Sequence, residues 1–229
     1  MQEGEPVEIE QAFATAAGKL TLQSSAEYMS ADNNGKGPIW EVGPEIEYGV
    51  MQGVQISVSP TYDFGASDQA SSGAAETHLL YQFTDQDEFL PALAVDLSYA
   101  SPYGGGDKTT EYGFRALASK WLGTSPTSPR IHLNLTCYQF GQPGAGERKD
   151  QLDAAAGGSF MLDSLSALVA DVADGATQER HQDAAFIDIG YRRDFAENWG
   201  VSVGVGKQIN ASGPGLRVFF SVEREFRLF

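Results

Sequence analysis

Hydrophobic and polar residues alternate strictly along two neighbouring stretches of the chain, 40–50 and 54–64. Every second residue is apolar: Trp40, Val42, Pro44, Ile46, Tyr48 and Val50 in the first stretch, and Val54, Ile56, Val58, Pro60, Tyr62 and Phe64 in the second. A period of two is typical of a β-strand with one apolar and one polar face. The short Met51–Gly53 segment between the stretches predicts a tight turn, so together they predict a β-hairpin.

The arms of this hairpin are long. Each runs to about ten residues, whereas a typical strand in a globular protein has ~5–6 residues and a tilted strand that crosses a bilayer has roughly 9–11. Aromatic residues lie near the ends of the apolar face, as in the interfacial girdle of a membrane barrel: Trp40, Tyr48, Tyr62 and Phe64. The hairpin therefore predicts an all-β protein, an antiparallel transmembrane β-barrel.

The same alternation recurs along the rest of the chain and predicts about twelve strands, from Lys19–Met29 to Gly215–Phe229. An even number is typical of bacterial outer-membrane barrels. The connections after strands two, four, six, eight and ten are expected to be short, and the others longer and more polar. Short periplasmic turns, longer outer loops and two termini on one side follow from that alternation. A closed barrel also leaves no unpaired strand edge in lipid.

Two parts of the chain give less definite predictions. Residues 1–19 show no period of two and are expected to form a periplasmic or inward-lying segment, which leaves 20–229 for the barrel. Residues 151–174 are rich in Ala and Gly. A hairpin turned at Asp163–Ser164 and a short helix are both open interpretations there.

Composition and charge restrict the function. The 229 residues have a mean hydropathy of -0.27 and contain no run of the ~18 apolar residues that a membrane helix needs. A barrel escapes that test because its polar lumen positions dilute every strand. The net charge of -16 argues against nucleic acid as a partner. A soluble acidic β-protein is also compatible with the composition.

The cellular location is inferred from the barrel and not from a leader. Met1 is followed by an acidic segment, so no signal peptide is recognised. We expect a mature form, exported to the bacterial outer membrane. The single Cys137 permits no internal disulfide and leaves the compartment open.

Several motifs, in order, resemble the phenol-degradation meta-pathway family of outer-membrane proteins. The matching pieces are EIEYGVMQGVQISVSPTY (45–62), FLPALAVDLSYASPYGGG (89–106), TTEYGFRALASKWLG (109–123), RIHLNLTCYQFG (130–141) and WGVSVGVGKQ (199–208). The resemblance covers roughly residues 40–229 and implies a barrel of about twelve strands in the outer membrane. The family's activity is poorly defined. Its name reflects genomic association with aromatic degradation, and the resemblance implies uptake of small hydrophobic molecules.

Strand parity assigns side chains to the two faces of the predicted barrel. The polar residues expected in the lumen are Glu41, Glu45, Glu47, Asp63, His78, Asp96, Glu111, Arg115, His132, Asp188, Arg192 and Arg217. The aromatic residues expected to face lipid are Trp40, Tyr48, Tyr62, Phe64, Tyr81, Tyr99, Tyr112, Phe114, Tyr191, Phe220 and Phe226. Desolvated charges need partners, so ion pairs are expected across the lumen. Twelve strands are compatible with either a filled or an open lumen.

The sequence does not predict catalysis. A lipase-type site needs a serine beside a histidine, and His132 has Asn134 two positions later but no serine nearby in the sequence. The chain has three histidines, His78, His132 and His181, and no HxH or His–Glu spacing supports a metal site from His78 and His132. Gly204–Lys207 (GVGK) lacks the spacing of a phosphate loop, and small inward-facing residues explain it better. We expect no enzymatic activity, no cofactor and no metal.

The sequence supports three functional hypotheses. The leading one is a passive channel or uptake route for small molecules, hydrophobic or aromatic ones among them. The second is a plugged accessory barrel whose loops bind a protein partner, and the third is a soluble ligand-binding β-barrel. The leading hypothesis implies the lipid bilayer, lipopolysaccharide, a small solute and the barrel-assembly machinery as partners.

Overall fold

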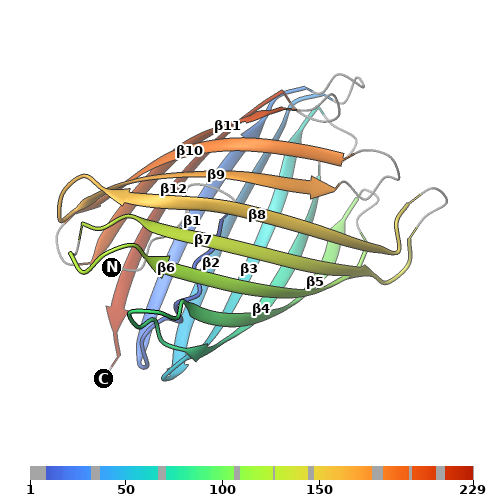
Figure 1. Ribbon diagram of the computed structural model, residues 1–229. Coiled ribbons are helices and arrows are strands. Elements are labelled where there is room, and N and C mark those ends of the chain that lie inside the picture. Colours follow the sequence, from blue (N-terminus) through green and yellow to red (C-terminus); the bar gives the residue numbers. More distant parts are fainter. Residues whose placement is uncertain are drawn as a thin grey trace.

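Twelve antiparallel strands form one closed barrel in the computed structural model (Figure 1). The structure describes residues 9–31, 37–66, 71–105, 109–125, 127–143, 147–176, 183–195, 198–209 and 215–228. The strands are β1 (Lys19–Met29), β2 (Ile39–Met51), β3 (Val54–Gly65), β4 (Ser72–Thr84), β5 (Ala92–Gly104), β6 (Glu111–Trp121), β7 (Arg130–Phe140), β8 (Asp150–Met161), β9 (Ser166–Ala176), β10 (Asp183–Phe195), β11 (Trp199–Gln208) and β12 (Leu216–Arg227). Each pairs with its neighbours in sequence, and β1 pairs with β12 to close the barrel. The predicted fold class is confirmed.

The predicted hairpin corresponds to β2 and β3. The register pairs Trp40 with Phe64 and Ile46 with Val58, so apolar residues of the two arms lie on the same face. The rings of Trp40 and Phe64 are stacked, with centroids 6.4 Å apart. Gly53 has a φ of 75°, a conformation that glycine adopts without the steric cost of a side chain, and it completes the tight turn.

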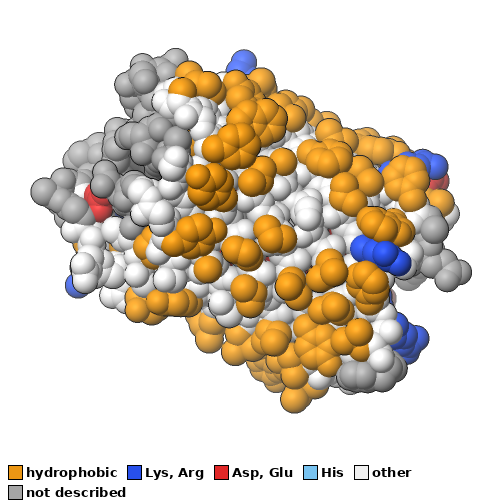
Figure 2. Space-filling model, turned by 180° about the vertical axis from the view of Figure 1, so that it is seen from behind, with side chains coloured by type: hydrophobic (Ala, Val, Ile, Leu, Met, Phe, Trp, Pro, Cys, Tyr) orange, Lys and Arg blue, Asp and Glu red, His pale blue; other side chains and the backbone are white. Residues whose placement is uncertain are grey.

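Large apolar side chains cover the outer face of the barrel. Alternation along every strand directs Leu, Ile, Val and aromatic residues outward, and Figure 2 shows them spread over the strands with few charged side chains among them. Ile46 and Tyr112, for example, are 52% and 51% exposed. An exposed apolar surface this extensive is typical of a membrane or interaction surface. Among the residues described, no helix is long and apolar enough to cross a membrane.

The connections alternate in length less regularly than predicted. Those between β2 and β3, β8 and β9, and β10 and β11 are short, but the connections 85–91 and 122–129 are as long as several on the opposite rim. The expectation of short turns after strands four and six is therefore wrong. The 85–91 connection needs its length because it folds over the neighbouring strand: Lys120 Nζ donates to the carbonyls of Asp87, Glu88 and Leu90 at 2.7, 3.0 and 3.1 Å.

Asp87 organises this connection from within. Its carboxylate accepts the backbone N–H groups of Leu90 and Phe89, both at 2.7 Å. These hydrogen bonds favour the charged form and lower the pKa of Asp87. The connection thereby presents the exposed side chains of Phe89 and Leu90 at the rim where the barrel begins and ends. Aromatic and apolar residues at a rim are typical of the membrane interface.

Residues 151–174 form a hairpin and not a helix. Its strands β8 and β9 are joined by a four-residue turn in which Leu165 N donates to Asp163 Oδ1 at 2.7 Å. The Ala- and Gly-rich pattern has a packing reason. A Cβ atom on Gly157 would lie 2.6 Å from both the carbonyl oxygen of Ala170 and the Cβ of Asp171, so a larger residue there does not fit.

Candidate functional site: the barrel lumen

The twelve polar residues assigned to the lumen by parity all lie at shielded positions. Asp63, Asp96, His132, Asp188, Arg192 and Arg217 are buried, and Glu41, Glu45, Glu47, His78, Glu111 and Arg115 are half-buried. Their neighbours along the strands are mostly exposed on the outer face. Of the eleven aromatic residues assigned to the outer face, Tyr48, Tyr191 and Phe226 are half-buried and the others are exposed.

One side of the lumen carries paired charges, which we call the paired wall: Asp188 and Arg192 of β10 with Arg217 and Glu223 of β12. Arg192 donates to both carboxylate oxygens of Glu223, at 2.8 and 2.7 Å. Arg217 donates to Asp188 Oδ1 at 2.9 Å and also contacts Oδ2. Bidentate pairing of this kind gives a buried guanidinium hydrogen bonds in place of those it would make with water.

These ion pairs reach across β11, which lies between β10 and β12, and glycines on β11 make the reach possible. The register places Gly206 directly between Asp188 and Arg217. A Cβ atom on Gly206 would overlap Asp188 Oδ1, and one on Gly200 would lie 2.7 Å from Arg192 Nη2. The GVGK sequence is therefore explained by inward-facing small residues, as predicted.

A second part of the lumen, on strands β2 to β6, is dominated by carboxylates, and we call it the acidic wall. It consists of Glu41, Glu45 and Glu47 of β2, Glu76 of β4, Asp96 of β5 and Glu111 of β6. His78 lies between two of them, with Nδ1 2.8 Å from Asp96 Oδ2 and Nε2 3.2 Å from Glu76 Oε1. Asp96 Oδ1 is buried and has no hydrogen-bond partner among the residues described. Arg115 of β6 is the guanidinium on this side.

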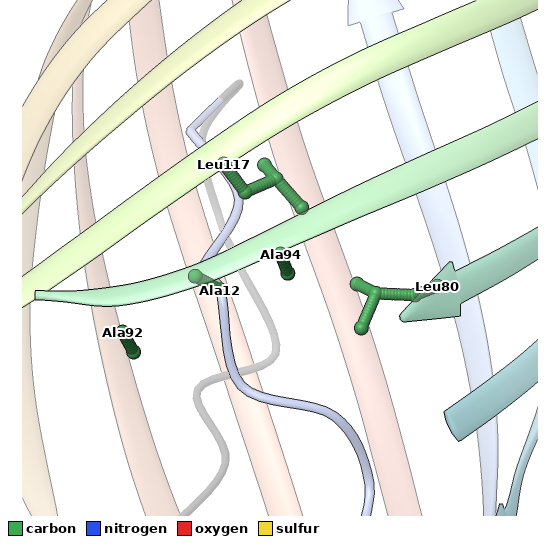
Figure 3. Packing of buried hydrophobic residues seen from close by; sticks show 5 residues of the cluster. All are labelled: Ala12, Leu80, Ala92, Ala94 and Leu117. Atoms are coloured by element: carbon green, nitrogen blue, oxygen red, sulfur yellow. The ribbon is translucent and has the colours of Figure 1, made fainter. Parts of the chain in front are cut away.

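Residues 9–18, which we call the N-terminal segment, run through the lumen. Figure 3 shows the segment at Ala12, packed among side chains that converge from β4, β5 and β6: Leu80, Ala92, Ala94 and Leu117. Further along, Ile9 is fully buried and packs against Val169 of β9. An apolar inner patch of this kind has a packing partner only because the segment occupies the lumen.

The backbone of the segment is held by side chains of the barrel wall. Thr15 N donates to Gln55 Oε1 at 2.8 Å, and Ala14 N donates to Gln82 Oε1 at 3.0 Å. Ala12 N donates to Ser119 Oγ at 2.9 Å, and Ile9 N donates to Asp171 Oδ2 at 2.7 Å. The acceptors belong to β3, β4, β6 and β9, so the segment crosses the bore from one wall to another.

Glu10 adds the charged contact of the segment. Its carboxylate forms an ion pair with Arg115. In the amide orientation that satisfies both groups, Asn134 accepts Glu10 N–H at 2.7 Å and donates to Glu10 O at 2.9 Å. Together with the backbone contacts, this anchors the segment at mid-barrel.

The segment enters the lumen over Gly49 of β2. Gly18 N donates to Gly49 O at 2.9 Å, and a Cβ atom on Gly49 would overlap the carbonyl oxygen of Ala16. Thr15 Oγ1 also contacts Glu47 at this point. The close approach of two backbones requires glycine here.

A serine does lie beside His132, contrary to the sequence expectation. Ser119 is paired with His132 across β6 and β7, and its Oγ is 2.8 Å from Nδ1. Sequence distance concealed this pair because the register of two strands determines it. Ser119 is buried beneath the segment and accepts the Ala12 N–H, so the hydroxyl serves as an anchor. His181 lies outside the described residues, and no group of side chains that the structure describes could hold a metal ion.

Arg115, which binds Glu10, was among the predicted lumen residues, but the side chains that accept the backbone N–H groups of the segment were not. Gln55, Gln82 and Ser119 have inward parity, but the prediction selected charged and histidine side chains. Asp171 and Glu223 are buried lumen acids that it also omitted. Parity, applied to every polar residue, would have found Gln55, Gln82, Ser119 and Glu223. Asp171 lies in the Ala- and Gly-rich stretch, where the alternation is poor.

Three solved structures that superpose on this barrel are an outer-membrane channel and two porins. The COG4313 outer membrane channel from Pseudomonas putida F1 superposes with a TM-score of 0.69 at 12% identity, over 96% of this chain and 100% of that one. The KdgM porin in complex with disordered oligogalacturonate gives 0.67 at 10% identity, over 90% and 99%. The NanC porin gives 0.61 at 10% identity, over 91% and 100%. No protein-family model and no curated protein sequence matches the chain.

Proposed function

We propose that this protein is a bacterial outer-membrane channel that admits small solutes, and that the N-terminal segment closes it in the conformation described here. The observation that carries the proposal is the distribution of side chains between the two faces of the barrel. Its outer face is apolar and its lumen is lined with charged side chains, which suits lipid outside and water inside. The channel and porin folds of its structural neighbours support the same role.

The proposal also includes the partners of the barrel and the protein family to which it is related. The apolar face would contact lipid and lipopolysaccharide, and the barrel-assembly machinery would insert the chain. The motifs between residues 45 and 208 support kinship with the phenol-degradation meta-pathway family. The proposal assigns no catalytic step, because Ser119 and His132 are covered by the N-terminal segment.

A permanently plugged accessory barrel is the second candidate. It is favoured by the number of wall side chains that bind the segment, including the buried anchor Asp171. Closure by hydrogen bonds to side chains is nonetheless reversible in principle. Each bond to a neutral side chain contributes only ~0.5–1.5 kcal/mol, and the bond to the Asp171 carboxylate about 1.5–3 kcal/mol.

Conductance separates the two candidates. We expect the refolded protein, inserted into a planar lipid bilayer, to give discrete current steps separated by long closed periods. Insertion is monitored independently by the shift of the folded barrel on an unheated gel. Folded, inserted protein that never conducts at any voltage would contradict the channel and favour the plugged barrel.

A further inference from the structure

The N-terminal segment occupies the lumen as a ligand would, and its contacts report which chemical groups the lumen binds. At five positions the segment supplies a backbone N–H donor and the wall supplies a side-chain oxygen. The acceptors come from Gln55, Gln82, Ser119, Asn134 and Asp171. Arg115 and Asn134, which bind Glu10, are the wall side chains that also donate. The wall around the segment is therefore chiefly an array of acceptors.

The charge of the lumen also favours solutes that donate hydrogen bonds, because carboxylates outnumber cationic side chains. On the paired wall, Arg192 and Arg217 are each matched by carboxylates. On the acidic wall, six carboxylates are accompanied by Arg115 and His78. Arg115 is paired with Glu10 while the segment occupies the lumen. A confined passage with this excess of carboxylates attracts cations and repels anions.

A buried acceptor on the acidic wall provides a third observation. Asp96 is 3% exposed, and its Oδ1 has no hydrogen-bond partner in the part of the chain that the structure describes. An unpaired buried carboxylate oxygen is costly, and a donor from a solute would remove that cost. Asp96 lies within the same wall as Glu76 and Glu111.

We propose that the lumen selects small cationic solutes rich in N–H donors, aliphatic amines above all, and excludes organic anions. This inference rests on the proposed channel function and names the substrate class of the same lumen. Solutes of this class replace the backbone N–H groups of the segment at the wall acceptors, and their charge is balanced by the acidic wall. The apolar clusters that the structure describes around Ala12 and Ile9 are filled by the segment itself.

The test measures ion selectivity and amine binding on the full-length protein. In a KCl gradient across a planar bilayer, the reversal potential is expected to show preference for K⁺ over Cl⁻. Spermidine, a small polyamine, is expected to reduce the K⁺ current reversibly, whereas citrate, an anion of similar size, leaves it unchanged. Calorimetric titration of spermidine into the detergent-solubilised protein measures binding without requiring conductance.

A pair of substitutions that removes two carboxylates from the acidic wall makes the test specific. Glu45→Gln with Glu111→Gln is expected to weaken spermidine binding about tenfold and to shift the reversal potential towards zero. The matched control, Glu88→Gln with Asp150→Asn, removes the same charge from exposed positions outside the lumen and should leave both quantities unchanged.

The outcomes distinguish the inference from the channel itself. Conductance with Cl⁻ preference or no preference, or calorimetry without spermidine binding, would overturn the amine selectivity while leaving a channel. Spermidine binding without conductance would support the lumen chemistry and refute the open passage.

Discussion

Gly49→Val is expected to open the channel. Its side chain would collide with the carbonyl oxygens of Ala16 and Thr15, where the N-terminal segment enters the lumen. The collision is also expected to weaken the hydrogen bond from Gly18 N to Gly49 O. Destabilising the closed state by ~1.4 kcal/mol would raise the open-to-closed ratio about tenfold, seen as a higher mean current per inserted barrel.

The control for this variant is Gly105→Val, on the opposite rim. A Cβ atom there has only Ser71 O within reach, at 4.0 Å, an ordinary contact distance. Its current should match that of the wild type. If Gly49→Val folds normally and also conducts like the wild type, the segment does not control the passage.

Arg217→Met is expected to destabilise the barrel by about 3–5 kcal/mol, because it leaves the buried carboxylate of Asp188 without its cation. The loss of the aromatic contacts of Arg217, whose guanidinium lies 4.1 Å from the centre of the Phe186 ring, adds to this cost. The measurement is the free energy of unfolding in urea, with the barrel reconstituted in lipid or detergent.

A second variant shows that charge and not volume is the cause. Combining Arg217→Met with Asp188→Leu removes both charges, and stability should recover in large part. Arg227→Met, an exposed position on the same strand, should change stability by at most ~0.5 kcal/mol. A single Arg217→Met variant as stable as wild type would show that the pair contributes nothing.

The strands were predictable from sequence because the signal for them is local. A barrel strand between lipid and a polar lumen alternates residue by residue, so β1 is found at Lys19–Met29 as the sequence predicts. The signal fails where one face is built of small residues. In β8, Gly157 is small because Asp171 lies against it, and this masks the alternation.

The lumen contacts were not predictable, because they depend on register and on a segment without a pattern. Asp188 and Arg217 meet only because Gly206 separates them in register on the intervening strand. Ser119 and His132 meet across two strands whose pairing no local pattern determines. The path of the segment follows from backbone N–H groups, which every residue except proline possesses and which leave no trace in the sequence.

A reversible covalent lock tests most directly whether the N-terminal segment gates the passage. Ala12→Cys and Ala94→Cys, in a Cys137→Ser background, place one thiol on the segment and one on β5 within the same packed cluster. With the disulfide verified by mass spectrometry, we predict that the oxidised barrel stays closed in a planar bilayer and that a reductant restores the current steps of the Cys137→Ser background. Equal conductance before and after reduction of the cross-linked protein would contradict the account.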